Sequence, residues 1–154
     1  ILVFIIDCLK GFLALYVTQL FISSTHEPLD LDINLYLYIA SFASLFGHCY
    51  PVWFDFKGGK GAATGVGNIL FIDPFLITVP LIVFIGILVF FRYVGLSTIT
   101  AFLSLFIFVY FLIGFSDYLF LIYLFLLFLF IVFTHRVNIA SMFKKTEHKV
   151  SFFK

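Results

Sequence analysis

Charged residues are scarce in this chain, because only 11% of its 154 residues are Asp, Glu, Lys or Arg while 64% are hydrophobic. Soluble domains carry charge at about 25% of their positions, so this composition excludes an ordinary soluble domain. The 25 Phe and eight Tyr residues would have no place on the surface of so small a soluble protein, whereas lipid accommodates them. The sequence therefore predicts a membrane protein.

Other absences narrow the function. The chain has only two cysteines, Cys8 and Cys49, and both lie in apolar segments, which indicates packed thiols rather than a disulfide or metal framework. No basic patch is interleaved with exposed aromatic residues, so we expect no nucleic-acid partner. The sequence also shows no pair of catalytic carboxylates, no serine elbow and no metal-ligating cluster.

Six apolar segments separated by polar residues run at 1–23, 34–54, 62–72, 75–91, 97–114 and 118–134. Four of them approach the length of about 20 residues that a helix needs to cross about 30 Å of hydrocarbon. The first would also qualify but for Asp7 and Lys10, and 62–72 covers only about half of a span.

Linkers with and without basic residues alternate along the chain. Linker 24–33 and the turns at 73–74 and 114–117 contain no Lys or Arg. The positive-inside rule then puts on the cytoplasmic side all eight cations of the other linkers and the tail: Lys57, Lys60, Arg92, Arg136, Lys144, Lys145, Lys149 and Lys154. Because this pattern requires 62–72 to cross, the sequence predicts an all-α bundle of about six transmembrane helices, one of them short, in a single domain over residues 1–154.

The stretch Lys57-Gly58-Gly59-Lys60-Gly61 carries the clearest functional signal, with two lysines and three glycines in five residues. Bare backbone amides beside ammonium groups form a concave positive site that suits a phosphate or another small oxyanion. A short helix beginning after Gly61 would add the positive end of its dipole. The alternative is a flexible basic turn that only satisfies the positive-inside rule. Because Gly61 rather than Ser or Thr follows Lys60, the stretch is not a nucleotide-binding P-loop.

Two further candidates lie in the first two segments. Asp7 and Lys10 are three residues apart, so they share a helix face and can pair. Either this pair holds two helices together, or Lys10 reaches the phosphate site. His48 lies near the cytoplasmic end of its span, where a lone histidine is more often structural but can also contact the phosphate site.

The last apolar segment closes on His135, Arg136 and Asn138. His135 and Asn138 are three residues apart and share one helix face, with Arg136 just beside it. These residues either form a plain juxtamembrane basic cluster or take part in the site. From Lys144 onward we expect a solvated or headgroup-contacting tail.

Three motifs resemble those of one known family. Gly47 to Thr64 fits G-H-x-x-P-V-F-x-x-F-K-G-G-K-G-V-A-T, with Trp53 for the first Phe after Val and Ala62 for the second Val. The other two motifs are D-x-x-K-G at Asp7, Lys10 and Gly11, and H-R-x-N-I at His135, Arg136, Asn138 and Ile139. On these residues the chain resembles the integral-membrane glycerol-3-phosphate acyltransferases that use acyl phosphate, the PlsY type.

The resemblance also carries departures and an expectation about length. Ser141 and Lys145 replace the Arg and Gly that usually follow the last motif, while Glu147 matches the family's Glu. Family members have seven spans, with one earlier span and a cytoplasmic loop bearing S-G-N-x-G-x-T-N before these motifs. We therefore expect this chain to be an N-terminally truncated copy.

The resemblance implies transfer of a fatty acyl group from acyl phosphate to the 1-hydroxyl of glycerol 3-phosphate, giving lysophosphatidic acid for phospholipid biosynthesis. It implies that His135 orients or deprotonates the hydroxyl, with Asn138 fixing it. The phosphate-binding residues would be Lys57, Gly58, Gly59, Lys60, Gly61, Lys10, His48 and Arg136. No metal or organic cofactor is needed, and the protein would lie in a bacterial-type cell membrane with its active face in the cytoplasm.

Two other functions stay open at this point. A small anion transporter or channel subunit would also combine a broken span with a basic pocket. The chain could also be an inactive truncated fragment.

Overall fold

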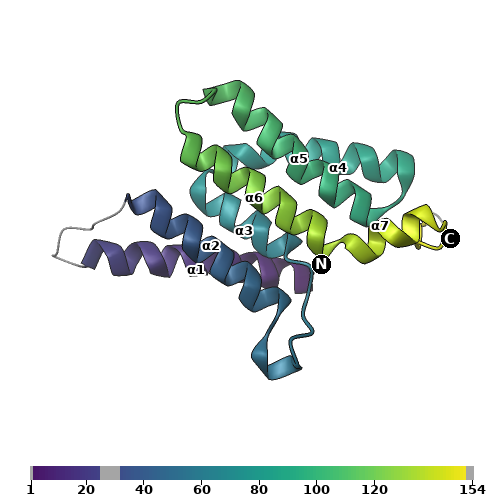
Figure 1. Cartoon of the computed structure of the whole chain (residues 1–154), viewed down its shortest axis with the longest axis horizontal. Helices are drawn as coiled ribbons and strands as arrows, with labels where there is room; N and C mark the ends of the chain where they lie inside the picture. Colours follow the sequence, from purple (N-terminus) through teal and green to yellow (C-terminus); the bar gives the residue numbers. More distant parts are fainter. Residues whose placement is uncertain (1, 25–31, 152–154) are drawn as a thin grey trace. The chain divides into compact units, whose positions relative to one another are not determined.

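The computed structural model describes residues 2–24 and 32–151. In this part of the chain all regular structure is helical, which confirms the predicted all-α class (Figure 1). The α-helices are α1 (Leu2–Ser24), α2 (Ile33–Cys49), α3 (Ala62–Ile72), α4 (Thr78–Phe91), α5 (Val94–Ile113), α6 (Tyr118–Thr134) and α7 (Arg136–Phe143), with 3-10 turns η1 (Val52–Phe54) and η2 (Pro74–Ile77).

Each predicted apolar segment corresponds to one helix, with two differences: the end of α2 and an additional helix, α7. We expected the second segment to continue to residue 54, whereas α2 ends at Cys49. Pro51 explains this difference, because a residue that precedes proline is disfavoured in the α conformation. The helix α7 after His135 was not predicted.

Acidic residues of the linkers act as helix caps. The side chain of Asp32 accepts a hydrogen bond from the amide of Asn34 at 2.8 Å, at the start of α2. The side chain of Asp117 accepts one from the amide of Phe120 at 2.9 Å, at the start of α6. Such caps satisfy amides that have no partner inside the helix.

The chain divides into two compact units, Ile1–Phe75 and Leu76–Lys154, which are described separately. The expectation of a single domain over residues 1–154 stays a prediction.

In the first unit, α1 packs against both α2 and α3. Glycines allow a close crossing of α1 and α3, since a Cβ on Gly67 would overlap the carbonyl oxygen of Cys8, and one on Gly11 would overlap that of Thr64. Close approach through small residues is a common way for helices to associate in lipid. The rings of Phe12 and Phe71 meet edge to face beside this crossing, with centroids 5.3 Å apart.

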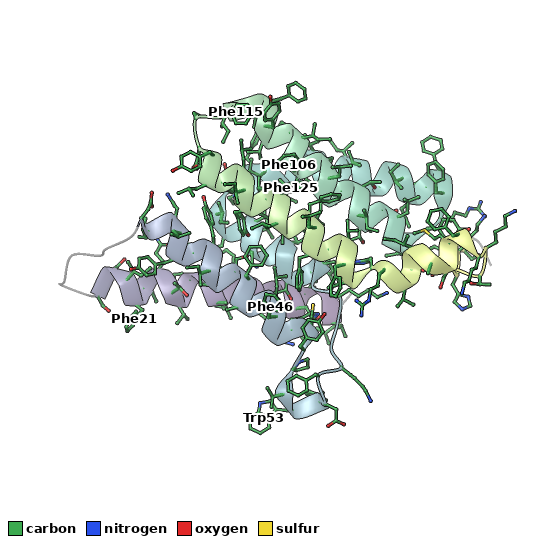
Figure 2. All side chains as sticks on the ribbon, viewed as in Figure 1. Phe21, Phe46, Trp53, Phe106, Phe115 and Phe125 are labelled. Carbon is green, nitrogen blue, oxygen red and sulfur yellow. The ribbon has the colours of Figure 1, made fainter. Side chains whose placement is uncertain are left out.

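In the second unit, α5 packs against α4 and α6, and α7 contacts α5 and α6. Leu105 and Val109 of α5 and Leu127 and Ile131 of α6 are almost completely buried. The labelled rings of Phe106 and Phe125 lie beside each other in Figure 2, with centroids 5.6 Å apart.

Three helices in the described part of the chain are long and apolar enough to cross a membrane: Leu2–Ser24, Pro74–Phe91 and Val94–Ile113. The number rises to four if α6 and α7, which are bent by 57° at His135, form one span. Helix α2 has 17 residues and α3 has 11. The predicted count of six crossings therefore stays a prediction, while the membrane class is supported.

Candidate functional site

The loop between α2 and α3 folds back onto the end of α2. The amide of Gly58 donates to the carbonyl oxygen of Cys49 at 3.0 Å, and the amide of Gly59 donates to that of His48 at 3.2 Å. We expected both amides to donate to a phosphate, whereas in this structure they have protein acceptors. The reason is that the last carbonyl groups of a helix have no donor inside it and need one from elsewhere.

Glycine is required where this loop touches His48. A Cβ on Gly59 would overlap Nε2 of the imidazole, and a Cβ on Gly58 would overlap the carbonyl oxygen of His48. Gly61, which caps the start of α3, has a φ of 78° that glycine adopts without strain. The glycines therefore shape the loop by allowing close approach and a sharp turn into α3.

A pocket of about 490 Å³ opens beside the loop within the first unit. Its lining residues are Lys10, Ala14, Ser44, Gly47, His48, Pro51, Phe54, Lys57 and Gly58. The side chain of Lys10 is 61% exposed, so its ammonium group can meet a solute. Two ammonium groups and an imidazole on one pocket wall make the site suitable for an anion.

Asp7 links the first helix to this pocket. Its Oδ1 lies 3.0 Å from Nζ of Lys10 and 3.6 Å from Nδ1 of His48. The predicted pair of Asp7 and Lys10 is therefore present within α1, and Lys10 also lines the pocket, while its contact with phosphate stays a prediction. The contact with His48 was not predicted, because it joins residues 41 positions apart on different helices.

A buried polar cluster of Ser41, Ser44 and Asn68 adjoins the pocket. Nδ2 of Asn68 donates to Oγ of Ser41 at 2.7 Å, and Oγ of Ser44 donates to Oδ1 of Asn68 at 3.3 Å. Ser44 also lines the pocket, so the cluster is connected to the candidate site through this residue. Sequence reasoning missed these residues, although a polar Asn within an apolar helix is a signal of an inward-facing side chain.

The hydroxyl of Thr64 adds one more polar atom near this cluster. It is buried in the first turn of α3 and has no hydrogen-bond partner within the described residues. An unsatisfied buried hydroxyl costs about 1–3 kcal/mol, which is unusual in a well-packed helix pair. Thr64 is the last residue of the long motif, and it does not line the pocket.

In the second unit, His135 lies at the bend between α6 and α7. The residue is only 4% exposed, and its Nδ1 lies 2.8 Å from the carbonyl oxygen of Ile131. Because a carbonyl oxygen can only accept, Nδ1 carries the proton in this contact and Nε2 is the basic nitrogen of the neutral ring. The structure therefore favours one tautomer of this predicted catalytic residue.

Asn138 faces a carboxylate and a glycine. Its Nδ2 donates to Oε1 of Glu147 at 2.6 Å. Its Cβ packs close to Gly95 at the start of α5, where an added Cβ would lie 3.1 Å away. Glu147 was noted only as a family match, and the structure adds that it orients the amide of Asn138.

Arg136, the first residue of α7, folds back on the end of α6. Its Nη1 donates to the carbonyl oxygen of Phe133 at 2.9 Å, and its guanidinium lies 4.4 Å from the centroid of the Phe133 ring. The predicted role of Arg136 in phosphate binding would require exchange of this exposed contact for a phosphate oxygen.

The tail, expected to be solvated or to contact lipid headgroups, is mostly exposed but also contacts the turn between α4 and α5. The amide of Val150 donates to the carbonyl oxygen of Arg92 at 2.9 Å, and Nζ of Lys149 lies 5.2 Å from the centroid of the Tyr93 ring. These contacts dock the tail on the turn between α4 and α5, and Glu147 joins the tail to Asn138 of α7. Sequence reasoning missed this because hydrophilic tails carry no periodic signal.

Two sets of predicted site residues are therefore formed, each within its own unit. The first unit brings Lys10, His48, Lys57 and Gly58 to one pocket, whose lining does not include Gly59, Lys60 or Gly61. The second unit brings His135 and Asn138 together around the bend at the end of α6.

Several apolar helices of spanning length in the described part of the chain define an integral membrane protein, and its first unit has a basic pocket at a helix end. Comparison with known proteins then identifies the family. The family model described as glycerol-3-phosphate acyltransferase matches residues 1–145, so the chain belongs to that family.

Individual relatives agree with this assignment. The glycerol-3-phosphate acyltransferase of Staphylococcus haemolyticus (strain JCSC1435) is 35% identical over 152 residues, which cover 96% of this chain and 71% of the relative. The one from Aquifex aeolicus (strain VF5) is 36% identical over 150 residues, which cover 97% of this chain and 72% of the relative.

Solved structures agree as well. The crystal structure of PlsY, an integral membrane glycerol 3-phosphate acyltransferase in its glycerol 3-phosphate form, matches with a TM-score of 0.79 and 35% identity. That match covers 97% of this chain and 70% of PlsY. The lysophosphatidic acid form of PlsY gives the same TM-score.

Proposed function

We propose that this chain transfers a fatty acyl group from an acyl phosphate to the 1-hydroxyl of glycerol 3-phosphate, giving lysophosphatidic acid and inorganic phosphate. The relatives are named glycerol-3-phosphate acyltransferases, which supports the acceptor and the type of reaction. The identity of the donor as an acyl phosphate is supported by the motif of residues 47–64 alone.

The observation that carries the proposal is the pocket that contains Lys10, Lys57 and His48. A phosphate monoester carries a charge of about −1.5 to −2 at neutral pH, so two ammonium groups compensate for it. Lys60 and the first turn of α3 would complete the binding of phosphate, because helix N-termini favour anions. Because the amides of Gly58 and Gly59 already donate to carbonyl oxygens of α2, we assign these two glycines to shaping the loop rather than to donating hydrogen bonds to phosphate.

The chemistry needs positioning more than acid catalysis. The oxygen of the 1-hydroxyl attacks the acyl carbon, a new ester C–O bond forms, and the C–O bond to the phosphate breaks with phosphate leaving. Because phosphate is a good leaving group, the protein chiefly aligns the two substrates and stabilises the developing oxyanion. No metal or organic cofactor takes part in this scheme.

We propose that Nε2 of His135 accepts the proton of the attacking hydroxyl. The contact of Nδ1 with Ile131 leaves Nε2 as the basic nitrogen, which is the form that a general base needs. Asn138 is held by Glu147 and would fix the acceptor, while Arg136 would bind phosphate. This scheme requires the His135 set and the Lys57 set to face the same compartment.

The proposed location is the cytoplasmic side of a bacterial-type cell membrane. The positive-inside rule supports it, since all eight cations of the basic linkers and tail then face the same compartment.

The first test replaces Lys60 with Ala and measures turnover of acyl phosphate and glycerol 3-phosphate in lipid vesicles. We expect kcat/KM to fall by about 100-fold or more, as for loss of one charged contact to a reacting group. Lys144→Ala is the matched control, because Lys144 is an exposed lysine on the same predicted side, and its activity should equal that of the unmodified protein. Unchanged activity of Lys60→Ala would remove Lys60 from the site.

The same assay separates catalysis from binding. His135→Ala should lower kcat while the affinity for glycerol 3-phosphate, measured directly by ligand binding, stays the same. A loss of affinity at unchanged kcat would instead make His135 a binding residue. Uptake of labelled glycerol 3-phosphate into sealed vesicles without acylation would favour a transporter over the proposed enzyme.

A further inference from the structure

Residues 52–56, called the aromatic loop below, expose an unusual amount of apolar surface. Trp53 is 91% exposed and Phe54 is 69% exposed. Figure 2 shows Trp53 at the far end of this loop, pointing away from the helices of the first unit. The other exposed apolar residues of the loop are Val52 and Phe56. Four neighbouring exposed apolar side chains would be unfavourable in water.

The chain keeps this loop close to the bilayer surface. The aromatic loop begins three residues after Cys49, the last residue of the apolar helix α2. Three residues of extended chain reach at most about 10 Å. With α2 crossing the bilayer as the sequence predicts, the loop therefore stays near the membrane level at which this helix ends.

Hydrogen bonds within the loop satisfy part of its backbone. The amides of Phe54 and Phe56 both donate to the carbonyl oxygen of Pro51 at 3.1 Å, and the amide of Lys57 donates to that of Phe54 at 2.9 Å. Backbone groups that enter lipid need such internal partners. Asp55 and Phe56 both have positive φ, at 50° and 59°, so a tight turn presents the side chains outward.

The charges beside the loop favour a lipid headgroup layer. Lys57 and Lys60 follow the loop directly, and Asp55 is the one acidic residue between α2 and α3. Basic side chains next to inserted aromatic residues bind anionic lipid headgroups. Tryptophan in particular prefers the boundary between headgroups and hydrocarbon.

We propose that the aromatic loop is a membrane-surface anchor, with its apolar side chains inserted at the boundary between the anionic headgroups and the hydrocarbon. Phe54 belongs both to this loop and to the lining of the pocket. Insertion therefore holds the mouth of the pocket at headgroup level, where a molecule with an acyl chain can reach it from the lipid. The proposal concerns residues 52–56, which adjoin the proposed phosphate site at Lys57, and its test does not depend on turnover.

Trp53 provides the test, because it is the single tryptophan of the chain. The full chain is reconstituted in vesicles of phosphatidylcholine and phosphatidylglycerol, and its fluorescence is quenched either by lipids brominated on the acyl chain or by iodide in the water. We expect strong quenching by brominated lipid, weak quenching by iodide, and an emission maximum shifted to shorter wavelength.

A matched control moves the reporter to the exposed tail. In Trp53→Phe combined with His148→Trp, we expect iodide to quench several-fold more than it does at position 53, and brominated lipid to quench several-fold less. A second variant, Phe56→Asp, places a charge in the loop at a position whose positive φ Asp tolerates. Trp53 should then become more accessible to iodide.

Two results would overturn the proposal. Iodide quenching of Trp53 equal to that of the tail reporter would place the loop in water. Protection of Trp53 from both quenchers would show that protein covers the loop.

Discussion

His48 connects three parts of the first unit through one side chain. Its Nδ1 faces the carboxylate of Asp7 on α1, and its Nε2 is covered by Gly59 of the following loop. Its carbonyl oxygen accepts the amide of Gly59 as well. The position of this imidazole therefore decides where the loop lies, and hence where Lys57 enters the pocket.

A double substitution tests this coupling at the level of residues. Gly59→Ala should lower the free energy of unfolding by about 1–3 kcal/mol, because the new Cβ overlaps the imidazole of His48. In a His48→Ala background the same substitution should cost much less, since the obstacle is gone. Unfolding of the purified protein in detergent, followed by circular dichroism against denaturant, measures both values.

The coupling energy from this cycle is the decisive quantity. If Gly59→Ala costs the same with and without the imidazole, the contact seen at Nε2 does not determine the loop.

At the level of elements, α1 and α3 are held together by backbone contact more than by large side chains. Gly11 and Gly67 each bring the backbone of one helix against the other, and Asn68 beside them bonds to Ser41 of α2. In lipid the hydrophobic effect contributes little to helix association, so close packing and buried hydrogen bonds carry more of the stability.

Because of this crossing, we expect the effect of a glycine-to-alanine substitution on stability to depend on its position. Gly67→Ala should destabilise the protein by about 1–3 kcal/mol, because its Cβ would overlap the carbonyl oxygen of Cys8 and backbone cannot rotate away. Gly86→Ala in α4 is the matched control, since a Cβ there meets nothing within 4 Å. The control should be neutral or stabilising by up to about 1 kcal/mol, because Ala is the better helix former.

Thermal unfolding of both variants in the same detergent checks this prediction. Equal melting temperatures for Gly67→Ala and Gly86→Ala would mean that the two helices do not rely on the glycine contact.

At the level of the whole molecule, the proposed enzyme depends on membrane topology. The Lys57 pocket and the His135 set belong to different units, and they can serve one reaction only if both face the same compartment. The distribution of lysine and arginine predicts that they do.

Cysteine labelling tests this topology. After Cys8 and Cys49 are replaced by Ala, single cysteines are placed by Lys60→Cys, Lys144→Cys and Ser116→Cys and treated with a membrane-impermeant reagent in intact cells and in inverted vesicles. Positions 60 and 144 should react from the cytoplasmic side and position 116 from the other side. Reaction of positions 60 and 144 from opposite sides would contradict both the six-crossing prediction and the joint site.

The sequence pattern predicted the individual helices well but did not predict the contacts between them. Hydrophobic run length predicted all six apolar helices to within a few residues, and Pro51 explains the early end of α2. The pairing of Asp7 with Lys10 followed from their spacing on one helix face. The contact of His48 with Asp7 and the docking of Glu147 on Asn138 could not be predicted, because they join separate elements.

The sequence by itself determined the membrane class, the helices and the family motifs, because these depend on the local order of apolar residues, prolines and glycines. Only the tertiary structure decided which groups the motif residues contact. It assigned the amides of Gly58 and Gly59 to the end of α2, brought Asp7 to His48 and docked the tail on the turn before α5. Such contacts depend on how distant segments pack, and packing is a property of the folded chain that no local pattern encodes.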